Sequence, residues 1–513
     1  MTTEDQFLTK GAKLVNIGLT LGSALGMLTF LNFFYRYSWT RERQFSRAID
    51  VALYYVLPLG IALVLLASTK LKPGHRANIL ILGVSLTVSI YAAEFFLESR
   101  YTSLSVATKP VMIVLADSRD KKKDAARLTK KFGIEIDTRT SGEVLDDLRK
   151  KGVDAVPIVT PSNHLFVKQP DNSIKSAINI DGREVMPLAG VSSKVTILCN
   201  EGGPWIDFRS DAHGFNNASN NWHSGPIEIA ALGDSFTQGY CVPADKNFVA
   251  LIGQRHPVVN LGVAGDGPLL MLAKLNEYLP VFKPKTVLWF YYEGNDLTDL
   301  QIERKSALLR NYLEEGFTQP GLAAQSDIDR AIMDEISRSA VREQERAKKN
   351  RPNEIISTLV AYAKLSYLRQ RLGLVGGVDA EDLKTGADLE GPNMDVFRNI
   401  MFQAKARVNA SGGQLYFVYL PEWARYANYT SWGKTKRNDV LNIVGNLGLP
   451  VVDIDGAFQA HGDPLSLFPF RGVGHYTEDG HRLVAEEVLR SLSPELAGPK
   501  ASARALRNGK LKN

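Results

Sequence analysis

The stretch that decides the fold is Ile227-Glu228-Ile229-Ala230-Ala231-Leu232-Gly233-Asp234-Ser235-Phe236-Thr237-Gln238-Gly239. Its first half is a mostly apolar run typical of a strand, and its second half has Gly and small polar residues where a strand turns into a helix. This pattern places Ser235 at a strand end. Ligands of open parallel sheets bind just outside the carboxyl ends of the strands, so this hydroxyl is well placed to attack a substrate. Serine alone is a weak nucleophile and needs a base and donors for an oxyanion.

The sequence after Ser235 predicts a parallel α/β sheet. Continuous apolar runs alternate with segments of helical length, as in strands that are buried on both faces and joined by right-handed crossovers. Residues 297–395 break this alternation with charged helical sequence, which predicts a helical insertion. The predicted strands are 227–232, 258–261, 286–292, 415–420 and 450–453, and the predicted helices are 248–256, 268–282, 394–408, 438–447 and 478–492.

Before this sheet, residues 99–200 predict a small α/β module. Its expected elements are a strand at 111–115, helices at 121–132 and 143–151, and a strand at 155–159. The catalytic domain is then predicted to comprise residues 201–296 and 396–495, and residues 496–513 form a basic tail.

Residues 1–98 predict a membrane region. Three apolar segments, Leu14 to Phe34, Val51 to Ser68 and Ala77 to Leu97, are each about as long as a helix that spans a hydrocarbon core of about 30 Å. Positive residues flank both intervening loops, so the positive-inside rule does not decide the orientation. We expect a multi-pass membrane protein with a cytoplasmic amino terminus and an extracytoplasmic catalytic domain.

Composition excludes several classes of protein. The formal net charge of +6 lies largely in the membrane-flanking loops and the carboxyl-terminal tail, so we expect no nucleic-acid partner. The two cysteines are too few for a cysteine-rich scaffold or a four-thiolate zinc site. Cys199 and Cys241 both lie close to the serine strand in the sequence, either as two separate thiols or as a disulfide, which would require an oxidising compartment.

Three further polar clusters fall at strand ends of the predicted sheet. Gly262-Val263-Ala264-Gly265-Asp266-Gly267 follows the second strand, Glu293-Gly294-Asn295-Asp296 follows the third, and His475-Tyr476-Thr477-Glu478-Asp479-Gly480-His481 precedes the last helix. With Gly233-Asp234-Ser235 they form four ordered blocks. In this order the chain resembles the SGNH, or GDSL-type, hydrolase superfamily over roughly residues 226–492, the insertion excepted.

The resemblance implies a flavodoxin-like, five-stranded parallel sheet and a role for one residue of each block. Ser235 corresponds to the nucleophile, and its own backbone N–H is one oxyanion donor. Gly265 would give a second N–H and Asn295 a side-chain amide. His475 would be the base that takes the serine proton and returns it to the leaving group. No metal ion and no organic cofactor is expected.

Two positions depart from the family pattern. Glu293 stands where the third block usually has Gly, and Gly472 stands where the triad Asp usually precedes the His by three residues. Three explanations stay open: a Ser-His dyad, a substitute carboxylate from Asp453 or Asp455, or an inactive descendant. His481 is an alternative base, although its place in the motif favours His475.

These observations predict a membrane-anchored serine esterase or acyltransferase. We expect it to act on ester groups, with O-acetyl groups of a cell-envelope polysaccharide as the first candidate and a lipid ester as the main competitor. The alternative class is a non-catalytic polysaccharide-binding or assembly component that retains the fold. Three helices are too few for a transport path of their own, which leaves room for a membrane-protein partner.

Overall fold

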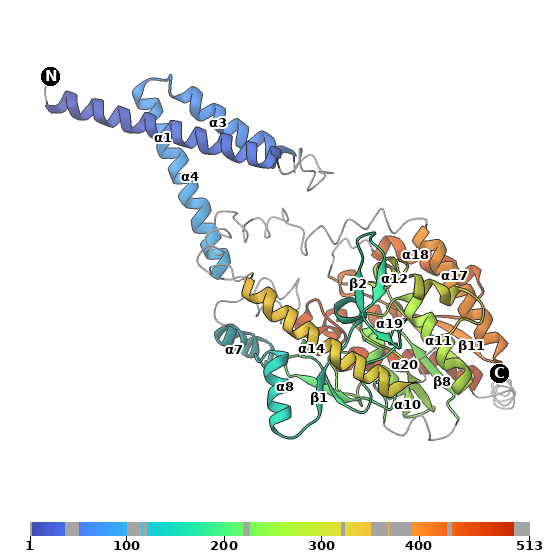
Figure 1. The fold of residues 1–513 in the computed structure, drawn as a ribbon. Helices are drawn as coiled ribbons and strands as arrows, with labels where there is room; N and C mark the ends of the chain where they lie inside the picture. Colours follow the sequence, from blue (N-terminus) through green and yellow to red (C-terminus); the bar gives the residue numbers. More distant parts are fainter. Residues whose placement is uncertain are drawn as a thin grey trace. The chain divides into compact units, whose positions relative to one another are not determined.

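The computed structural model describes residues 3–35, 51–99, 115, 121–218, 226–319, 324–349, 368, 392–427 and 433–496 (Figure 1). The chain divides into two compact units. The first comprises residues 1–101 and 352–378, and the second comprises residues 102–351 and 379–513. The predicted strand at 111–115, the Gly-rich stretch 373–391 and the tail beyond residue 496 lie outside the described residues, apart from Leu115, which is helical.

The first unit is built from apolar helices. They are α1 (Thr3–Phe34), the short π-helix η2 (Ala52–Val56), α3 (Leu57–Ser68) and α4 (Pro73–Ser99). Gly22 and Gly26 of α1 let α3 approach closely, because a Cβ at Gly26 would lie 3.1 Å from the Ala62 side chain. Ser23 Oγ donates a hydrogen bond of 2.8 Å to the carbonyl of Ala62. Small residues at such contacts are typical of helices packed in a membrane.

Two of these helical segments are long and apolar enough to cross a membrane among the residues that the structure describes, where the sequence analysis predicted three. They are Lys10–Phe34 and Pro73–Phe96. The middle apolar helix, Tyr54–Ser68, is shorter than a full span. From residue 52 the chain forms the π-helical turn η2 and then the 12-residue helix α3, and residues 36–50 before them lie outside the described residues.

The second unit is organised around a five-stranded parallel sheet, as predicted. The strand order is β12-β11-β10-β8-β9, and every neighbouring pair is parallel. This is the order of a flavodoxin-like sheet, in which the chain reverses its direction of growth between β8 and β10. The strands are β8 (Ile229–Leu232), β9 (Val258–Asn260), β10 (Thr286–Tyr292), β11 (Gln414–Leu420) and β12 (Val451–Asp453).

Alternate side chains of each strand enter separate cores on the two faces of the sheet, as the period of two requires. Ala230, Trp289 and Phe417 belong to one buried cluster, and Ala231 and Phe290 belong to the other. The first cluster includes side chains of α11 (Pro268–Phe282), α17 (Pro392–Ala410) and α18 (Gly433–Asn446), and the second includes side chains of α10 (Phe248–Gly253), α19 (Ile454–Ala460) and α20 (Glu478–Leu496).

A second, three-stranded sheet precedes the nucleophile strand. In it β6 (Val195–Cys199) lies between β1 (Ala155–Pro157), which runs parallel to it, and β7 (Ile206–Arg209), which is antiparallel. The helices α7 (Lys121–Phe132) and α8 (Ser141–Lys150) precede these strands. The predicted domain boundary after residue 200 falls within the β6–β7 connection, so the second sheet extends into residues that were expected to belong to the catalytic domain.

The second sheet and its loops share a core with the five-stranded sheet. Val156 of β1, Leu165 and Met186 belong to the same buried cluster as Leu269 of α11. Ala155, by contrast, packs in a small separate cluster with α8. The module is therefore joined to the five-stranded sheet by a continuous apolar interface.

The described part of the predicted insertion is helical. Its elements are α12 (Asp296–Glu303), α13 (Ala307–Arg310), the 3-10 helix η4 (Asn311–Leu313) and α14 (Gln325–Lys349). Ile328 and Ile332 of α14 are buried in the larger core cluster. Asp329 accepts hydrogen bonds from the backbone N–H and the hydroxyl of Ser192, at 3.0 and 2.6 Å. The insertion thus packs beside the loop that leads into β6.

Candidate active site

Ser235 lies at the carboxyl end of β8, at the point where the order of the sheet reverses. It is the first residue of the short helix α9 (Ser235–Gln238), and the carboxylate of Asp234 caps this helix by accepting from the N–H of Phe236 at 2.9 Å. Gly233 is required before it, because a Cβ there would lie 2.0 Å from the Thr237 hydroxyl. A parallel sheet places its ligand site at such a reversal.

His475 is in hydrogen-bond contact with Ser235. The distance between His475 Nε2 and Ser235 Oγ is 2.8 Å. The histidine comes from the loop before α20, 240 residues further along the chain. A nucleophile and base within about 2.6–3.2 Å of each other satisfy the geometric requirement for proton transfer from the serine.

The other ring nitrogen of His475 contacts a glutamate that the sequence analysis did not consider. Glu201 Oε2 lies 2.9 Å from His475 Nδ1 and also accepts from the backbone N–H of His475 at 2.9 Å. An ionised carboxylate is only an acceptor, so Nδ1 carries the proton and Nε2 is free to accept from Ser235. Glu201 follows β6 by two residues, so it comes from the segment that joins the strands of the second sheet.

The electrostatics of this pair match its geometry. Burial opposes the charged imidazolium, but the Glu201 carboxylate and its hydrogen bond raise the pKa of His475 above its ordinary value. Burial likewise opposes the ionised form of Glu201, but the charge of His475 and its two N–H groups lower the pKa of this carboxyl. The pair therefore stabilises the imidazolium that a serine hydrolase forms when the base takes the proton.

The oxyanion candidates follow the strands on either side of β8. Gly265 follows β9 and has φ of +83°, a conformation that favours glycine. Asn295 follows β10 at the start of α12, but its side chain does not cap that helix. Its Nδ2 instead donates to Asp299 Oδ2 at 2.8 Å. Since an amide group has two hydrogens, one remains for an oxyanion.

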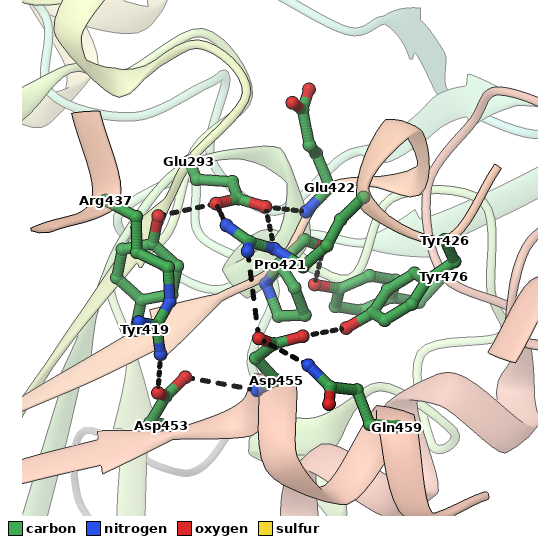
Figure 2. A network of polar contacts seen from close by, with 11 residues as sticks. Glu293, Tyr419, Pro421, Glu422, Tyr426, Arg437, Asp453, Asp455, Gln459 and Tyr476 are labelled. Atoms are coloured by element: carbon green, nitrogen blue, oxygen red, sulfur yellow. Dashed lines mark hydrogen bonds and ion pairs between the residues drawn. The ribbon is translucent and has the colours of Figure 1, made fainter. Parts of the chain in front are cut away.

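The two aspartates that were expected as substitutes for the triad acid lie in a different network (Figure 2). Asp453 caps α19 and pairs with Arg437. Asp455 accepts from Tyr426 Oη at 2.8 Å and from Gln459 at 2.9 Å. As a correction to the sequence analysis, the carboxylate hydrogen-bonded to His475 is that of Glu201.

Glu293, the unusual residue of the third block, anchors this network (Figure 2). Its carboxylate pairs with Arg425 and accepts from Tyr419 Oη at 2.5 Å and from the N–H of Glu422 at 2.8 Å. Beside this network, Tyr476 Oη donates to the Pro421 carbonyl at 2.6 Å. The network therefore ties the loops after β10 and β11 together, and Tyr476 ties the His475 loop to them.

His481, the alternative base, is fully buried away from Ser235. Its Nδ1 accepts from the backbone N–H of Phe248 at 3.2 Å. Burial, with a smaller contribution from the charge of His475, lowers the pKa of His481 to about 3. It is therefore a neutral core residue that joins α20 to α10.

Behind the site lies a set of buried ionisable groups. Lys274 of α11 pairs with Asp266, and both side chains are almost completely buried. Burial raises the pKa of Asp266 to about 7, although the charge of Lys274 opposes this. Glu303 caps the start of α11 by accepting from the N–H groups of Gly267 and Leu269, at 2.6 and 2.9 Å. These groups fix the loop that carries Gly265.

Among the described residues, one group of three potential metal ligands lies together, formed by Glu201, Cys241 and His475. Cys241 is in a disulfide with Cys199, so its sulfur is not a thiolate ligand. This leaves one carboxylate and one imidazole, which already contact each other.

No family model matches the chain, and neither does any curated relative. Solved structures do match it. A lipolytic protein of the G-D-S-L family from Desulfitobacterium hafniense is 14% identical with a TM-score of 0.28, over 52% of this chain and 98% of that chain. A lipase/acylhydrolase from Enterococcus faecalis is 12% identical with a TM-score of 0.28, over 52% and 95%. An acetyl xylan esterase is 9% identical with a TM-score of 0.30, over 52% and 100%.

The five-stranded parallel sheet has the flavodoxin-like strand order that the sequence analysis predicted. These matches cover about half of this chain, and their identities and TM-scores are too low to bear on its function. The chemistry of the site is therefore argued from its own geometry. Sequence reasoning missed Glu201 because it precedes the resembling region. The signal that could have found it is Cys199, two residues earlier, whose link to Cys241 brings this segment to the nucleophile loop.

Proposed function

We propose that the chain is a serine-dependent esterase or acyltransferase in which Ser235, His475 and Glu201 form the catalytic triad. One observation carries the proposal: Ser235 Oγ, both ring nitrogens of His475 and the partly buried carboxylate of Glu201 lie in one hydrogen-bonded line. This line ends at the reversal point of the sheet, which is the usual ligand site of an open parallel sheet.

The chemistry proceeds in two halves. His475 takes the proton of Ser235 as the serine oxygen attacks an ester carbonyl, and the imidazolium is stabilised by Glu201. The negative charge on the carbonyl oxygen is met by the N–H of Ser235, the N–H of Gly265 and the amide of Asn295. His475 then protonates the leaving alcohol. Water or an acceptor hydroxyl, deprotonated by the same histidine, releases the acyl group from the serine.

The substrate class follows from the compartment. A disulfide beside the triad supports an oxidising environment, and two helices that could span a membrane support anchoring at its surface. An O-acetylated polysaccharide of the cell envelope has the required ester in that place, and a lipid ester is the competing substrate. The non-catalytic alternative was supported by Gly472, which stands where the family usually has the triad Asp. In the proposed triad, the Glu201 carboxylate takes the place of that Asp.

The test uses the full chain in detergent. We expect it to hydrolyse a small chromogenic acetate ester and to react with a fluorophosphonate probe, and we expect Ser235→Ala to abolish both. A folded wild-type chain whose Ser235 stays unlabelled would favour the binding role. Comparing acetylated polysaccharide with a lipid ester as substrate, with and without an acceptor hydroxyl, separates the two substrates and distinguishes hydrolysis from transfer.

A further inference from the structure

The segment that carries Glu201 is a tight turn from Asn200 to Gly203, closed by a hydrogen bond of 2.9 Å from the N–H of Gly203 to the carbonyl of Asn200. On one side the turn is attached to residues without regular secondary structure. Asn200 Nδ2 donates to the carbonyl of Asp137 at 2.9 Å, and the N–H of Asp137 donates to the carbonyl of Gly203 at 2.9 Å. These contacts attach the turn to the segment between α7 and α8, and not to the loop that follows Ser235.

On the other side the turn is crosslinked to the nucleophile loop. Cys199 and Cys241 form a disulfide with a Cα–Cα distance of 5.4 Å. Cys241 follows Ser235 by six residues, and the ring of its neighbour Tyr240 lies 4.6 Å from the ring of His475. The crosslink therefore joins the chain two residues before Glu201 to the chain six residues after Ser235.

The crosslink also lies directly beside the acid and base. The Cys241 sulfur, a carboxylate oxygen of Glu201 and a ring nitrogen of His475 all lie within 4.8 Å of one another. Leu198, Cys199, Phe208 and Cys241 form a small buried cluster of their own around the disulfide. Cys241 has φ of +66°, an unusual conformation for a residue other than glycine, and the surrounding structure must hold it there.

From this arrangement we propose that Cys199 and Cys241 are positioning residues, whose disulfide holds Glu201 against His475 and makes turnover by Ser235 depend on the crosslink. The proposal rests on the proposed function. Two hydrogen bonds from His475 share one carboxylate oxygen, so a small movement of the turn breaks both. Misplacing a group of the site by about 1 Å can cost about 10²-fold in rate.

The experiment is a four-variant cycle in the full-length chain in detergent. Cys199→Ala/Cys241→Ala is measured with Glu201 present and in the Glu201→Gln background, and kcat and KM for the chromogenic acetate are followed across pH. We expect the cysteine pair to lower kcat by about 10- to 10²-fold when Glu201 is present, with KM little changed. In the Glu201→Gln background we expect a loss in kcat of less than about threefold, because the negative charge that the disulfide holds beside His475 is already absent.

If removing the cysteine pair lowered kcat by the same factor in both backgrounds, the proposal would be overturned, because the disulfide would then act on stability alone. No loss in either background would overturn it as well. If the cysteine variant does not fold, the folded wild-type chain is treated with a reductant instead. We expect kcat to fall when the Cys199–Cys241 disulfide is reduced and to recover on reoxidation. A kcat that is the same in the reduced and oxidised states would refute the positioning role.

The two proposals fail in different ways. Absence of Ser235-dependent turnover and labelling in the oxidised wild-type chain would refute the esterase activity, and the positioning role with it. Turnover that requires Ser235 but is indifferent to the disulfide would refute the positioning role alone.

Discussion

Replacing Glu201 by Gln tests the proposed triad most directly. Gln keeps the size of the side chain and an oxygen that accepts from Nδ1 and the backbone N–H of His475, so the ring stays oriented. What is lost is the negative charge beside the imidazolium. Two unit charges about 4 Å apart interact by about 4 kcal/mol at an effective dielectric constant of 20. Because each 1.36 kcal/mol is a factor of ten in rate, we expect kcat/KM to fall by about 10²- to 10³-fold.

The pH dependence should change in a direction that a general loss of stability does not produce. Activity rises with pH as His475 loses its proton, and Glu201 raises the pKa of His475. Removing the carboxylate charge therefore lowers that pKa, so the acidic limb of the kcat/KM profile should move to lower pH while its plateau falls. The assay is hydrolysis of the chromogenic acetate by the full chain between about pH 5 and 9.

The chain offers a matched control in a second His–Glu pair. Glu228 Oε2 lies 3.3 Å from His256 Nδ1, near the other end of β8 from Ser235. Glu228→Gln should leave both the plateau and the acidic limb unchanged. A Glu201→Gln chain with wild-type kcat/KM, or with an acidic limb that stays in place, would refute the reasoning and favour a Ser-His dyad.

Three further substitutions test the roles assigned to Asn295 in the oxyanion site, to Lys274 in stability and to Asp453 outside the triad. Asn295→Ala should lower kcat by about 10²- to 10³-fold with fluorophosphonate labelling of Ser235 still detectable, and an unchanged kcat would remove Asn295 from the oxyanion site. Lys274→Met leaves Asp266 buried without its partner and should lower the free energy of unfolding by about 3–5 kcal/mol in denaturant titrations. Because burial raises the pKa of Asp266, its carboxyl keeps its proton to higher pH in the folded than in the unfolded state, so this loss should be smaller at pH 5 than at pH 8. Asp453→Asn should change kcat by less than about threefold, since Asp453 caps α19 and pairs with Arg437, and a loss comparable to that of Glu201→Gln would return it to the triad.

Much of the catalytic sheet could be predicted because its strands are short apolar runs bounded by helices of regular length. The bounds of α11 and β10 agree with the predicted ones. The ends of parallel strands meet at one edge, so the residues after β8, β9 and β10 could be assigned to a common site. Their order across the sheet, with β8 between the other two, then brings Ser235 between the loops of Gly265 and Asn295.

Glu201 could not be predicted in the same way, because no local pattern marks it. It lies in a turn outside the catalytic sheet, and its contact with His475 depends on how two sheets pack together. Asp453 was a reasonable expectation, since it ends a strand of the correct sheet. Its carboxylate is instead used locally, to cap α19 and to pair with Arg437. Helix capping of this kind is common for an Asp at a strand-to-helix turn.

If the proposed triad is correct, the position of Glu201 in the sequence also limits how the chain can be divided or recombined. In chain order the acid comes first, then the serine, then the histidine. A fragment that begins at Pro226, where the resemblance predicted from the sequence begins, would therefore contain Ser235 and His475 without the Glu201 carboxylate. A chimera that takes the residues before Pro226 from a second protein of the same architecture would also replace the carboxylate that contacts His475. We therefore expect a fragment to keep the proposed activity only when its boundary lies before β6, so that Cys199, Glu201 and Cys241 are transferred together.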